Sequence, residues 1–248
     1  MRTDVIYIGD CIQGLKNLPD DSVDLVVTSP PYNINSNKYE KYKDNLSDEE
    51  YYSFIKECLN ELLRVTKYYV FFNFQILKDN RNVFYKIMCE FNKYLKTEFI
   101  WAKTNPVNIS NNGNICRGFE YIMCYSKSDN EDMIFRRGNY EMKDYISNTL
   151  IKPVNSNNKY NEIHSAIFPL WLPRYFIKYF SEENDIVLDP FMGSGTTAKA
   201  CYELNRRFIG FEIDPEYCEI ARKRLKQKVI TGFFGTQANS TSSSFNKD

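Results

Sequence analysis

The stretch from Ile186 to Thr197, Ile-Val-Leu-Asp-Pro-Phe-Met-Gly-Ser-Gly-Thr-Thr, constrains the fold more than any other part of the chain. Three apolar residues predict a short buried strand, Asp189 ends it, and Gly193 and Gly195 predict a tight turn before a helix. A strand, a glycine turn and a helix N-terminus together present backbone N–H groups and a carboxylate to a nucleotide-like ligand. We expect the glycines to be required because a Cβ atom would block the close approach of backbone to that ligand.

The same stretch also indicates the chemistry of the ligand. The dinucleotide fingerprint G-x-G-x-x-G is incomplete, because Gly195 is followed by Thr196, Thr197 and Ala198. A pyrophosphate is therefore disfavoured. An acidic strand end before the turn better suits a ligand with an ammonium group, such as S-adenosylmethionine.

The composition bounds the function and the compartment. The chain has 248 residues, with 32 basic and 32 acidic side chains, so a nucleic-acid function would need local segregation of charge. Seven cysteines without a C-x-x-C pair, together with a single histidine, argue against a zinc site and for a reducing compartment. The N-terminus leads directly into a strand, and no apolar run has membrane length. We expect a cytoplasmic or nucleoid-associated protein that is not secreted, binds no metal and has no membrane partner.

The hydrophobic pattern predicts alternating strands and helices. Ser47 and Glu50 form a capping box before an amphipathic helix, residues 84–91 predict a second helix, residues 168–180 an aromatic one, and Pro215 suits the first turn of the last helix. Seven strands are predicted, at residues 5–10, 23–27, 69–74, 98–102, 121–125, 186–189 and 208–212. Their apolar runs are short and continuous, as in strands buried on both faces, so we expect an α/β sheet covered by helices with ligands at the carboxyl ends of the strands.

The chain is predicted to form one domain over residues 1–230. Within it, residues 128–162 are polar, Asn-rich and weakly periodic. We interpret them as an insertion, because they are too few to bury a core of their own. Residues 231–248 have low complexity and are predicted to be a disordered tail.

A second informative turn, Ser29-Pro30-Pro31-Tyr32, follows the second predicted strand. Each proline fixes φ and lacks an N–H group, so the turn is rigid, and we expect the proline carbonyls to point to solvent as acceptors. A serine hydroxyl and a proline carbonyl can accept the two hydrogens of an exocyclic NH₂ group, while the tyrosine ring stacks on a flat heterocycle. The rival interpretation, a hydrolase nucleophile at Ser29, needs a base, and the single histidine, His164, lies in the insertion region.

Together the two turns resemble those of the β group of amino-methylating DNA methyltransferases. In that family an S/D/N-P-P-Y/F motif precedes a D-P-F-x-G-S-G-T-T motif, which is a circular permutation of the ordinary order. This order distinguishes it from the protein-glutamine and ribosomal-RNA methylases that also use a P-P-Y turn. The similarity runs from about Val5 to Leu225, apart from the insertion. It implies a Rossmann-like, seven-stranded S-adenosylmethionine-dependent methyltransferase sheet with helices on both faces.

The resemblance assigns roles to individual residues. The catalytic turn consists of Ser29, Pro30, Pro31 and Tyr32. The expected cofactor-binding residues are Asp189 near the methionine part, Glu212 on the ribose hydroxyls, Asp10 near the adenine, and Phe168, Pro169, Phe191, Gly193, Gly195 and Thr196. The segment from Trp101 to Lys103 resembles a strand end near the target base. Simpler interpretations remain open: Asp10 as a turn or cap residue, Phe191 and Trp101 as core residues, Glu212 as an exposed strand end and His164 as structural.

The resemblance also suggests a mechanism. The target base leaves the duplex, because its amino nitrogen cannot otherwise reach the methyl carbon. Its amino hydrogens bond to Ser29 Oγ and the Pro30 carbonyl, and the methyl group is transferred directly, in line, with no covalent enzyme intermediate. In the family, serine at the first position accompanies mostly cytosine N4 as the target. Asn33 after the tyrosine is more familiar from the adenine N6 enzymes, which leaves adenine as the alternative.

DNA is the expected partner, and residues 103–118 and 128–162 are the expected source of sequence preference. The side chains predicted to contact nucleic acid are Asn33, Lys103, Arg136 and Arg137. Specificity could be supplied by a homodimer or by a separate specificity subunit, and a cognate restriction endonuclease is a further candidate partner. Two other functions stay open: an amino-methylase of RNA or small molecules, and an inactive DNA- or cofactor-binding module, against which the intact Ser29–Tyr32 turn argues.

Overall fold

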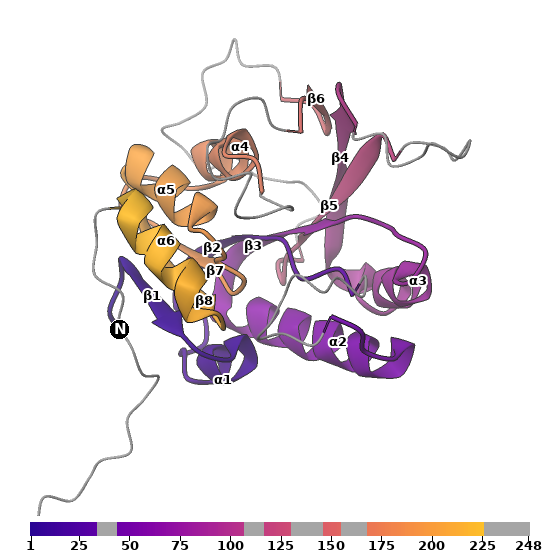
Figure 1. The fold of residues 1–248 in the computed structure, drawn as a ribbon, viewed down its shortest axis with the longest axis horizontal. Helices are drawn as coiled ribbons and strands as arrows, with labels where there is room; N and C mark the ends of the chain where they lie inside the picture. Colours follow the sequence, from indigo (N-terminus) through magenta and orange to yellow (C-terminus); the bar gives the residue numbers. More distant parts are fainter. Residues whose placement is uncertain (34–43, 107–116, 130–145, 155–167, 226–248) are drawn as a thin grey trace, which may run out of the picture.

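The computed structural model describes residues 1–33, 44–106, 117–129, 146–154 and 168–225. These residues form an eight-stranded sheet between two layers of helices (Figure 1). The strands are β1 (Val5–Ile8), β2 (Val23–Thr28), β3 (Thr66–Phe74), β4 (Leu95–Lys103), β5 (Phe119–Tyr125), β6 (Thr149–Lys152), β7 (Ile186–Asp189) and β8 (Arg207–Glu212). The helices are α1 (Cys11–Lys16), α2 (Asp48–Val65), α3 (Arg81–Glu90), α4 (Trp171–Phe180), α5 (Thr196–Glu203) and α6 (Pro215–Leu225), with a short 3₁₀ turn η1 (Asn92–Tyr94).

The strand order is β1-β8-β7-β2-β3-β5-β4-β6. β5 runs antiparallel to both of its neighbours, and the other pairs are parallel. The chain passes from β2 to β3 in one direction across the sheet and from β7 to β8 in the other. The direction of winding therefore reverses between the adjacent strands β2 and β7, and such a switch point is where open α/β sheets bind ligands.

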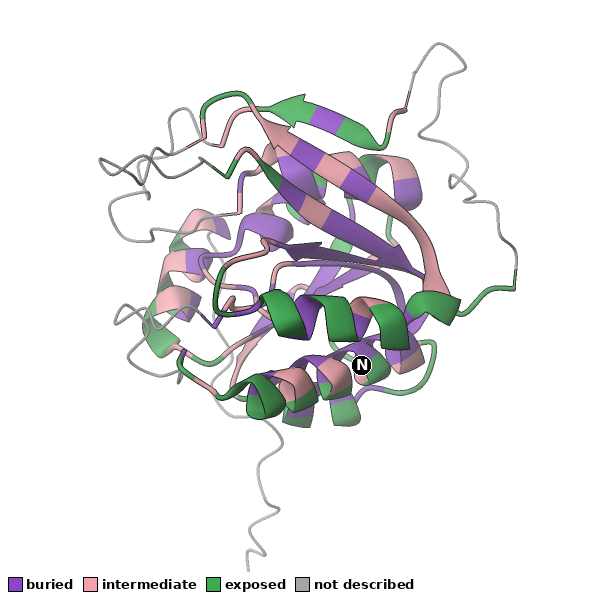
Figure 2. Cartoon of the chain, turned by 90° about the vertical axis from the view of Figure 1, so that its right-hand side faces the viewer, coloured by how far each residue is buried: buried purple, intermediate pink, exposed green. Residues whose placement is uncertain are grey.

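The helices cover both faces of the sheet, with α1, α2 and α3 on one side and α4, α5 and α6 on the other (Figure 1). Phe72 of β3 packs in the first of these two cores, and its neighbour Phe71 packs in the second, as the two-residue period of a strand requires. The central strands are buried while the helices expose their outer faces (Figure 2). The prediction of strands buried on both faces is thus confirmed.

Local signals place several helix ends where the sequence predicts them. Ser47 and Glu50 form both bonds of the capping box before α2, and Pro215 is the first residue of α6. The aromatic helix α4 begins at Trp171, later than the predicted residue 168, because a turn comes first in which the Pro169 carbonyl accepts a bond from the Leu172 N–H group.

Two elements were not predicted. α1 has six residues, too few for a recognisable helical period. β6 lies inside the segment 128–162 that we interpreted as an irregular insertion, and it adds an eighth strand by pairing parallel with β4. Of its four residues only Leu150 is buried, so no alternating pattern marks it in the sequence. The predicted tail, residues 231–248, lies outside the described residues. Among the described helices, none is both long and apolar enough to cross a membrane.

Candidate active site

The two motif-bearing turns leave the same edge of the sheet. β2 ends at Thr28 and β7 ends at Asp189, and these strands are parallel neighbours. The Thr28 hydroxyl donates a hydrogen bond of 2.6 Å to Asp189 Oδ1 across 161 positions of the chain. Segments that are far apart in the sequence, the Ser29–Tyr32 turn and the glycine turn, therefore begin side by side.

The Asp189 carboxylate connects the Ser29–Tyr32 turn to the glycine turn through hydrogen bonds. Besides Thr28, its carboxylate accepts the Thr197 hydroxyl at 2.6 Å and the Phe191 N–H group at 3.0 Å. Burial raises the pKa of Asp189 above its ordinary value, and the three donors oppose that shift. With both carboxylate oxygens engaged inside the protein, Asp189 first of all fixes the shape of the turn. If the Asp189 carboxylate also binds the methionine part of a cofactor, it does so through the lone pairs that these three donors leave.

The backbone conformation gives the glycine turn a requirement for glycine in addition to the predicted one. Gly193 and Gly195 have φ angles of 50° and 81°, in the left-handed region that other residues adopt at a cost. A Cβ atom on Gly195 would lie 2.8 Å from the Cβ atom of Ala221 in α6. Backbone conformation and helix packing thus constrain Gly195 by themselves, and the close approach of a ligand stays a prediction. Thr196 is buried, and its hydroxyl accepts a bond of 3.2 Å from Arg224.

Glu212 ends β8 and is joined to the glycine turn. Its Oε2 atom accepts the Gly193 N–H group at 2.7 Å, and Oε1 accepts the Asp214 N–H group at 2.9 Å. Burial raises the pKa of Glu212 to about 7, against the effect of these two donors. Glu212 is therefore a half-buried carboxylate built into the turn, and the interpretation of it as a merely exposed strand end does not hold.

The remaining predicted cofactor residues lie around this edge with simpler roles in the fold. Asp10 is exposed and caps α1 by accepting the Gln13 N–H group at 2.9 Å, which matches the cap interpretation. Phe191 is partly buried and packs edge-on against Phe54, with ring centroids 6.0 Å apart. Phe168 is half-buried, and the buried Pro169 follows it just before α4.

The Ser29–Tyr32 turn is held from several sides. Ser29 is half-buried and Pro30 is buried. The Pro31 carbonyl accepts the Tyr51 hydroxyl at 2.7 Å, so the expectation that both proline carbonyls point to solvent is wrong for Pro31. The Tyr32 carbonyl accepts the Asn80 amide at 2.9 Å.

Asn33, predicted to contact nucleic acid, instead completes this turn. It has a left-handed φ of 54°, which asparagine tolerates better than most residues. Its amide oxygen accepts the Leu46 N–H group at 2.7 Å, and its amide nitrogen donates to the Leu46 carbonyl at 2.8 Å. The side chain is 5% exposed and fully engaged, so it holds the turn in place and does not face a nucleic acid.

A buried polar network, here called the Glu120 network, lies against the turn. Its shortest contact is an ion pair of 2.6 Å between Lys103 Nζ and Glu120 Oε1. Asn73 Nδ2 donates to Glu120 Oε2 and to Tyr32 Oη, both at 2.8 Å. Tyr32 Oη in turn donates to Glu120 Oε2 at 3.3 Å and lies 2.9 Å from Ser29 Oγ.

The Glu120 network changes the role predicted for Lys103. The Lys103 side chain is 8% exposed and its charge is matched by Glu120, so it is a buried neighbour of the Ser29–Tyr32 turn and not a surface contact for nucleic acid. Trp101 is buried beside it, as the core interpretation predicted, and donates from Nε1 to the Lys152 carbonyl at 3.0 Å. Burial, and secondarily the charge of Glu120, raises the pKa of Tyr32 well above its ordinary value.

Sequence reasoning missed Asn73 and Glu120. Both are polar residues inside strands that otherwise read as apolar, Tyr-Val-Phe-Phe-Asn-Phe and Phe-Glu-Tyr-Ile-Met. That pattern is the available signal, since a polar residue buried in a sheet needs partners. Topology supplies the rest, because the antiparallel β5 brings its amino end to the edge where β3 and β4 finish.

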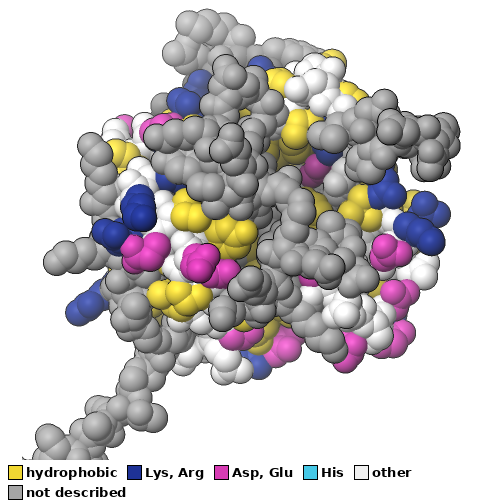
Figure 3. All heavy atoms as spheres, in the orientation of Figure 1, with side chains coloured by type: hydrophobic (Ala, Val, Ile, Leu, Met, Phe, Trp, Pro, Cys, Tyr) yellow, Lys and Arg dark blue, Asp and Glu magenta, His cyan; other side chains and the backbone are white. Residues whose placement is uncertain are grey.

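Arg136, Arg137 and His164 are outside the described residues. On the face shown in Figure 3, the described Lys and Arg side chains are interspersed with Asp and Glu, in keeping with the balanced composition.

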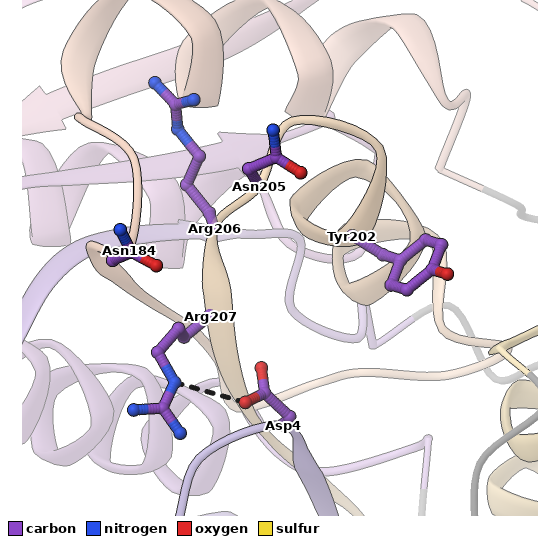
Figure 4. Close-up of a pocket in the computed structure, with 6 residues that line it drawn as sticks. All are labelled: Asp4, Asn184, Tyr202, Asn205, Arg206 and Arg207. Carbon is purple, nitrogen blue, oxygen red and sulfur yellow. Dashed lines mark hydrogen bonds and ion pairs between the residues drawn. The ribbon is translucent and has the colours of Figure 1, made fainter.

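A hollow of about 490 Å³ lies at the opposite edge of the sheet, before the first residues of β1, β7 and β8 (Figure 4). Arg207 and Asp4 form an ion pair of 3.2 Å in it. The residues that line it are Asp4, Asn184, Tyr202, Asn205, Arg206 and Arg207. The hollow is therefore separate from both motif-bearing turns.

The doubly wound sheet, with these two turns at its switch point, defines the class of Rossmann-like methyltransferases. Residues 23–223 match the DNA methylase family N6_N4_Mtase. The type II methyltransferase M.HpaI of Haemophilus parainfluenzae is 32% identical over 244 residues, which span 92% of this chain and 76% of that protein. M.BglII of Bacillus subtilis is 30% identical, over 87% of this chain and 67% of that protein. The chain belongs to the N6/N4 family of amino-methylating DNA methyltransferases.

Solved structures agree with this assignment. PvuII DNA methyltransferase (cytosine-N4-specific) superposes with a TM-score of 0.70 at 25% identity, over 88% of this chain and 85% of that one. The complex of M1.HpyAVI with S-adenosylmethionine superposes with a TM-score of 0.64, also at 25% identity, over 89% of this chain and 98% of that one.

Proposed function

We propose that this enzyme transfers the methyl group of S-adenosylmethionine to the exocyclic amino group of a base extruded from DNA, with cytosine N4 as the target. One observation carries the proposal: the amine-binding turn and the glycine turn follow adjacent parallel strands that are tied by the Thr28–Asp189 hydrogen bond of 2.6 Å. This arrangement sets a methyl donor beside an amine acceptor, which is the proximity that a direct transfer requires.

The cofactor would lie over the glycine turn. Glu212, at the end of β8, is suited to the ribose, because a carboxylate can accept bonds from both hydroxyls of a vicinal diol. Asp10 ends the turn after β1, and a main-chain bond of 2.9 Å from Gly9 to the Glu212 carbonyl keeps β1 beside β8. Phe168, Pro169 and Phe191 are the apolar candidates for its walls. The cofactor supplies an electrophilic methyl group on a sulfonium centre.

The target amine would bind at the Ser29–Tyr32 turn. Ser29 Oγ and the Pro30 carbonyl accept its two N–H hydrogens, which draws the nitrogen lone pair out of conjugation with the ring and towards the methyl group. The Tyr32 ring is half-buried and offers a face for stacking, a contact worth about 1–3 kcal/mol per base. These bonds strengthen as the nitrogen becomes cationic, so they stabilise the transition state more than the bound substrate. The bond from the methyl carbon to sulfur would break as the bond to nitrogen forms, S-adenosylhomocysteine would be the leaving group, and the nitrogen would then lose a proton to solvent.

Cytosine N4 is favoured by Ser29 at the first position of the turn and by the similarity to the cytosine-N4-specific PvuII enzyme. The deciding experiment is incubation of unmethylated DNA with the enzyme and S-adenosylmethionine, followed by mass spectrometry of the nucleosides. N4-methylcytosine is the expected product. N6-methyladenine would overturn the choice of base, and the absence of any methylated nucleoside would overturn the proposed function.

Replacing Ser29 by alanine tests its role directly. The Ser29→Ala enzyme should lose about 100- to 1,000-fold in kcat, as when one preorganised transition-state contact is removed, with little change in affinity for S-adenosylmethionine. Ser53→Ala is the matched control, because the Ser53 hydroxyl is exposed on α2 and, among the described residues, donates to the Glu49 carbonyl of the same helix at 2.8 Å. Equal turnover of the Ser29→Ala and Ser53→Ala enzymes would exclude the proposed role of Ser29.

Two other functions are separable by experiment. Competition between DNA and RNA substrates distinguishes a DNA enzyme from an RNA amino-methylase. An inactive binding module would show a thermal shift with S-adenosylmethionine and no methyl transfer. The similar proteins named type II methyltransferases favour a modification enzyme with a cognate restriction endonuclease. Sedimentation with and without DNA distinguishes a monomer from a homodimer.

A further inference from the structure

The mechanism above leaves the Glu120 network without a role. We propose that Glu120 is a positioning residue that sets the direction of the hydrogen bonds behind the catalytic turn, so that Ser29 Oγ can only accept a bond from the target amine. This inference rests on the proposed function, since it concerns how the same turn binds its amine. It is carried by the contacts among Ser29, Tyr32, Asn73, Lys103 and Glu120.

Proton counting gives the direction of these bonds. The Tyr32 hydroxyl has one proton, which it donates to Glu120 Oε2 at 3.3 Å. The 2.9 Å contact between Tyr32 and Ser29 allows either atom to be the donor, and with the tyrosine proton directed to Glu120 we infer that the donor is Ser29. The serine proton therefore points inward. Ser29 Oγ also lies 3.4 Å from Asn73 Nδ2, a longer contact than the other two that this amide nitrogen makes, and a lone pair remains for a donor on the substrate side.

Asn73 supports the same direction. Its amide nitrogen faces Glu120 Oε2 and Tyr32 Oη, both at 2.8 Å. A reversed amide would set its oxygen against the carboxylate oxygen, and two acceptors at that distance repel each other. Asn73 Oδ1 is buried without a hydrogen-bond partner in the described structure, so the network fixes the donor side of this amide at the expense of its acceptor. Tyr32 Oη thus accepts from Asn73 and directs its own proton to Glu120.

Lys103 holds the carboxylate in this role. Its ammonium group lies 2.6 Å from Glu120 Oε1, which leaves Oε2 for Asn73 and Tyr32. The Lys103 and Glu120 side chains are 8% and 9% exposed, so solvent weakens the pair little. Because burial keeps the Tyr32 pKa well above its ordinary value, the phenol retains the proton that it donates.

The direction matters because an amine presents hydrogens. With the network reversed, Tyr32 would donate to Ser29, and the serine proton would turn towards the N–H group of the target base. Glu120→Gln keeps the shape of the side chain but provides an amide nitrogen that can donate to Tyr32 Oη. The substitution therefore permits the reversed direction.

The test compares single-turnover methyl transfer by the Glu120→Gln enzyme and the wild type. We expect the rate to fall about 10- to 100-fold, with unchanged dissociation constants for S-adenosylmethionine and DNA. Glu90→Gln is the matched control, because Glu90, the last residue of α3, has the same two kinds of partner. Its carboxylate accepts a hydrogen bond from the Tyr52 hydroxyl and forms an ion pair of 2.6 Å with Lys56. The Glu90→Gln enzyme should keep the wild-type rate.

A double-mutant cycle separates positioning from general damage to the structure. Tyr32→Phe keeps the ring and the Lys103–Glu120 pair but removes the hydroxyl through which Glu120 acts, so it should also lower the rate. In the Tyr32→Phe background, Glu120→Gln should cause no further loss of rate. If the Glu120→Gln enzyme does not fold, the Tyr32→Phe enzyme alone tests the inference. A Tyr32→Phe enzyme with unchanged cofactor affinity and a wild-type rate of methyl transfer would overturn it.

The other possible results of these experiments distinguish the positioning role of Glu120 from the proposed function. A wild-type rate for the Glu120→Gln enzyme, or the same loss with and without the Tyr32 hydroxyl, would refute the positioning role while leaving the proposed function intact. A wild-type enzyme that methylates no DNA would refute the proposed function itself.

Discussion

Thr28→Val is the sharpest test of the contact that joins the two turns. Thr28 is fully buried, and its hydroxyl donates to the Asp189 carboxylate at 2.6 Å. Valine has nearly the same shape, so the substitution removes the donor while it preserves the packing between β2 and β7. Asp189 is left with the Thr197 hydroxyl and the Phe191 N–H group as donors.

The expected loss follows from the charge of the acceptor. A hydrogen bond to a charged group contributes about 1.5–3 kcal/mol, whereas one between neutral groups contributes about 0.5–1.5 kcal/mol. Thr28→Val should therefore lower the free energy of unfolding by about 1.5–3 kcal/mol. For a chain of this length that corresponds to a fall in Tm of about 3–12 °C.

The assay is urea unfolding with and without S-adenosylmethionine, using Thr66→Val as the control. Thr66 is also buried, and its hydroxyl donates at 2.6 Å to a neutral acceptor, the Leu62 carbonyl. Thr66→Val should thus cost about 0.5–1.5 kcal/mol. Only Thr28→Val should also weaken cofactor binding, because its bond to Asp189, together with the β2–β7 pairing, holds the glycine turn beside the Ser29–Tyr32 turn.

The pH dependence provides an independent check. Burial already raises the pKa of Asp189, and losing the Thr28 donor raises it further in the variant. The folded variant then binds its proton more readily than the folded wild type, so acidification stabilises the variant relative to the wild type. The stability gap should narrow as the pH falls towards the pKa of Asp189. Equal losses for the two threonine variants, with a gap that does not change with pH, would refute this account.

Two further predictions concern the glycine turn. Affinity for S-adenosylmethionine, measured by calorimetry, should rise between pH 6 and pH 8, because Glu212, with its pKa of about 7, loses its proton and becomes a double acceptor. Glu212→Gln should remove that pH dependence. A pH dependence retained in the Glu212→Gln enzyme would contradict the proposed contact of Glu212 with the ribose. Gly195→Ala should cost about 1–3 kcal/mol in denaturant unfolding because of its φ of 81° and the 2.8 Å approach to Ala221. Gly118→Ala should be nearly neutral, because no atom of the described residues lies within 4 Å of the added Cβ atom. Similar losses in both variants would contradict the packing argument.

The fold was predictable where local and periodic signals agree. The capping box at Ser47 and Glu50, the proline at 215 and the apolar runs of the seven predicted strands were all placed within a few residues. β6 was not predictable, because a four-residue strand with one buried side chain carries no alternating pattern. Its place is decided by pairing with β4, which is a tertiary contact.

The site was predictable at its motifs and less so around them. The positions of Ser29, Asp189 and Glu212 at one edge follow from strand ends that the sequence marks. The burial of Lys103 does not, because it depends on Glu120 arriving from an antiparallel strand 17 positions later in the chain. Asn33 was assigned to nucleic acid on the strength of its place after the motif, and only the structure reveals that the Leu46 backbone occupies its amide.

The interleaved strand order has a consequence for the integrity of the enzyme. A cut between β5 and β6 would leave the amine turn on one fragment and the glycine turn on the other, but β7 and β8 lie between β1 and β2 in the sheet. The first fragment would lack the two strands that lie between β1 and β2. In the second fragment all three strands, β6, β7 and β8, would lose a pairing partner. The turn that we propose for the amine and the turn that we propose for the cofactor are therefore not separable modules, since each depends on strand pairing contributed by the other part of the chain.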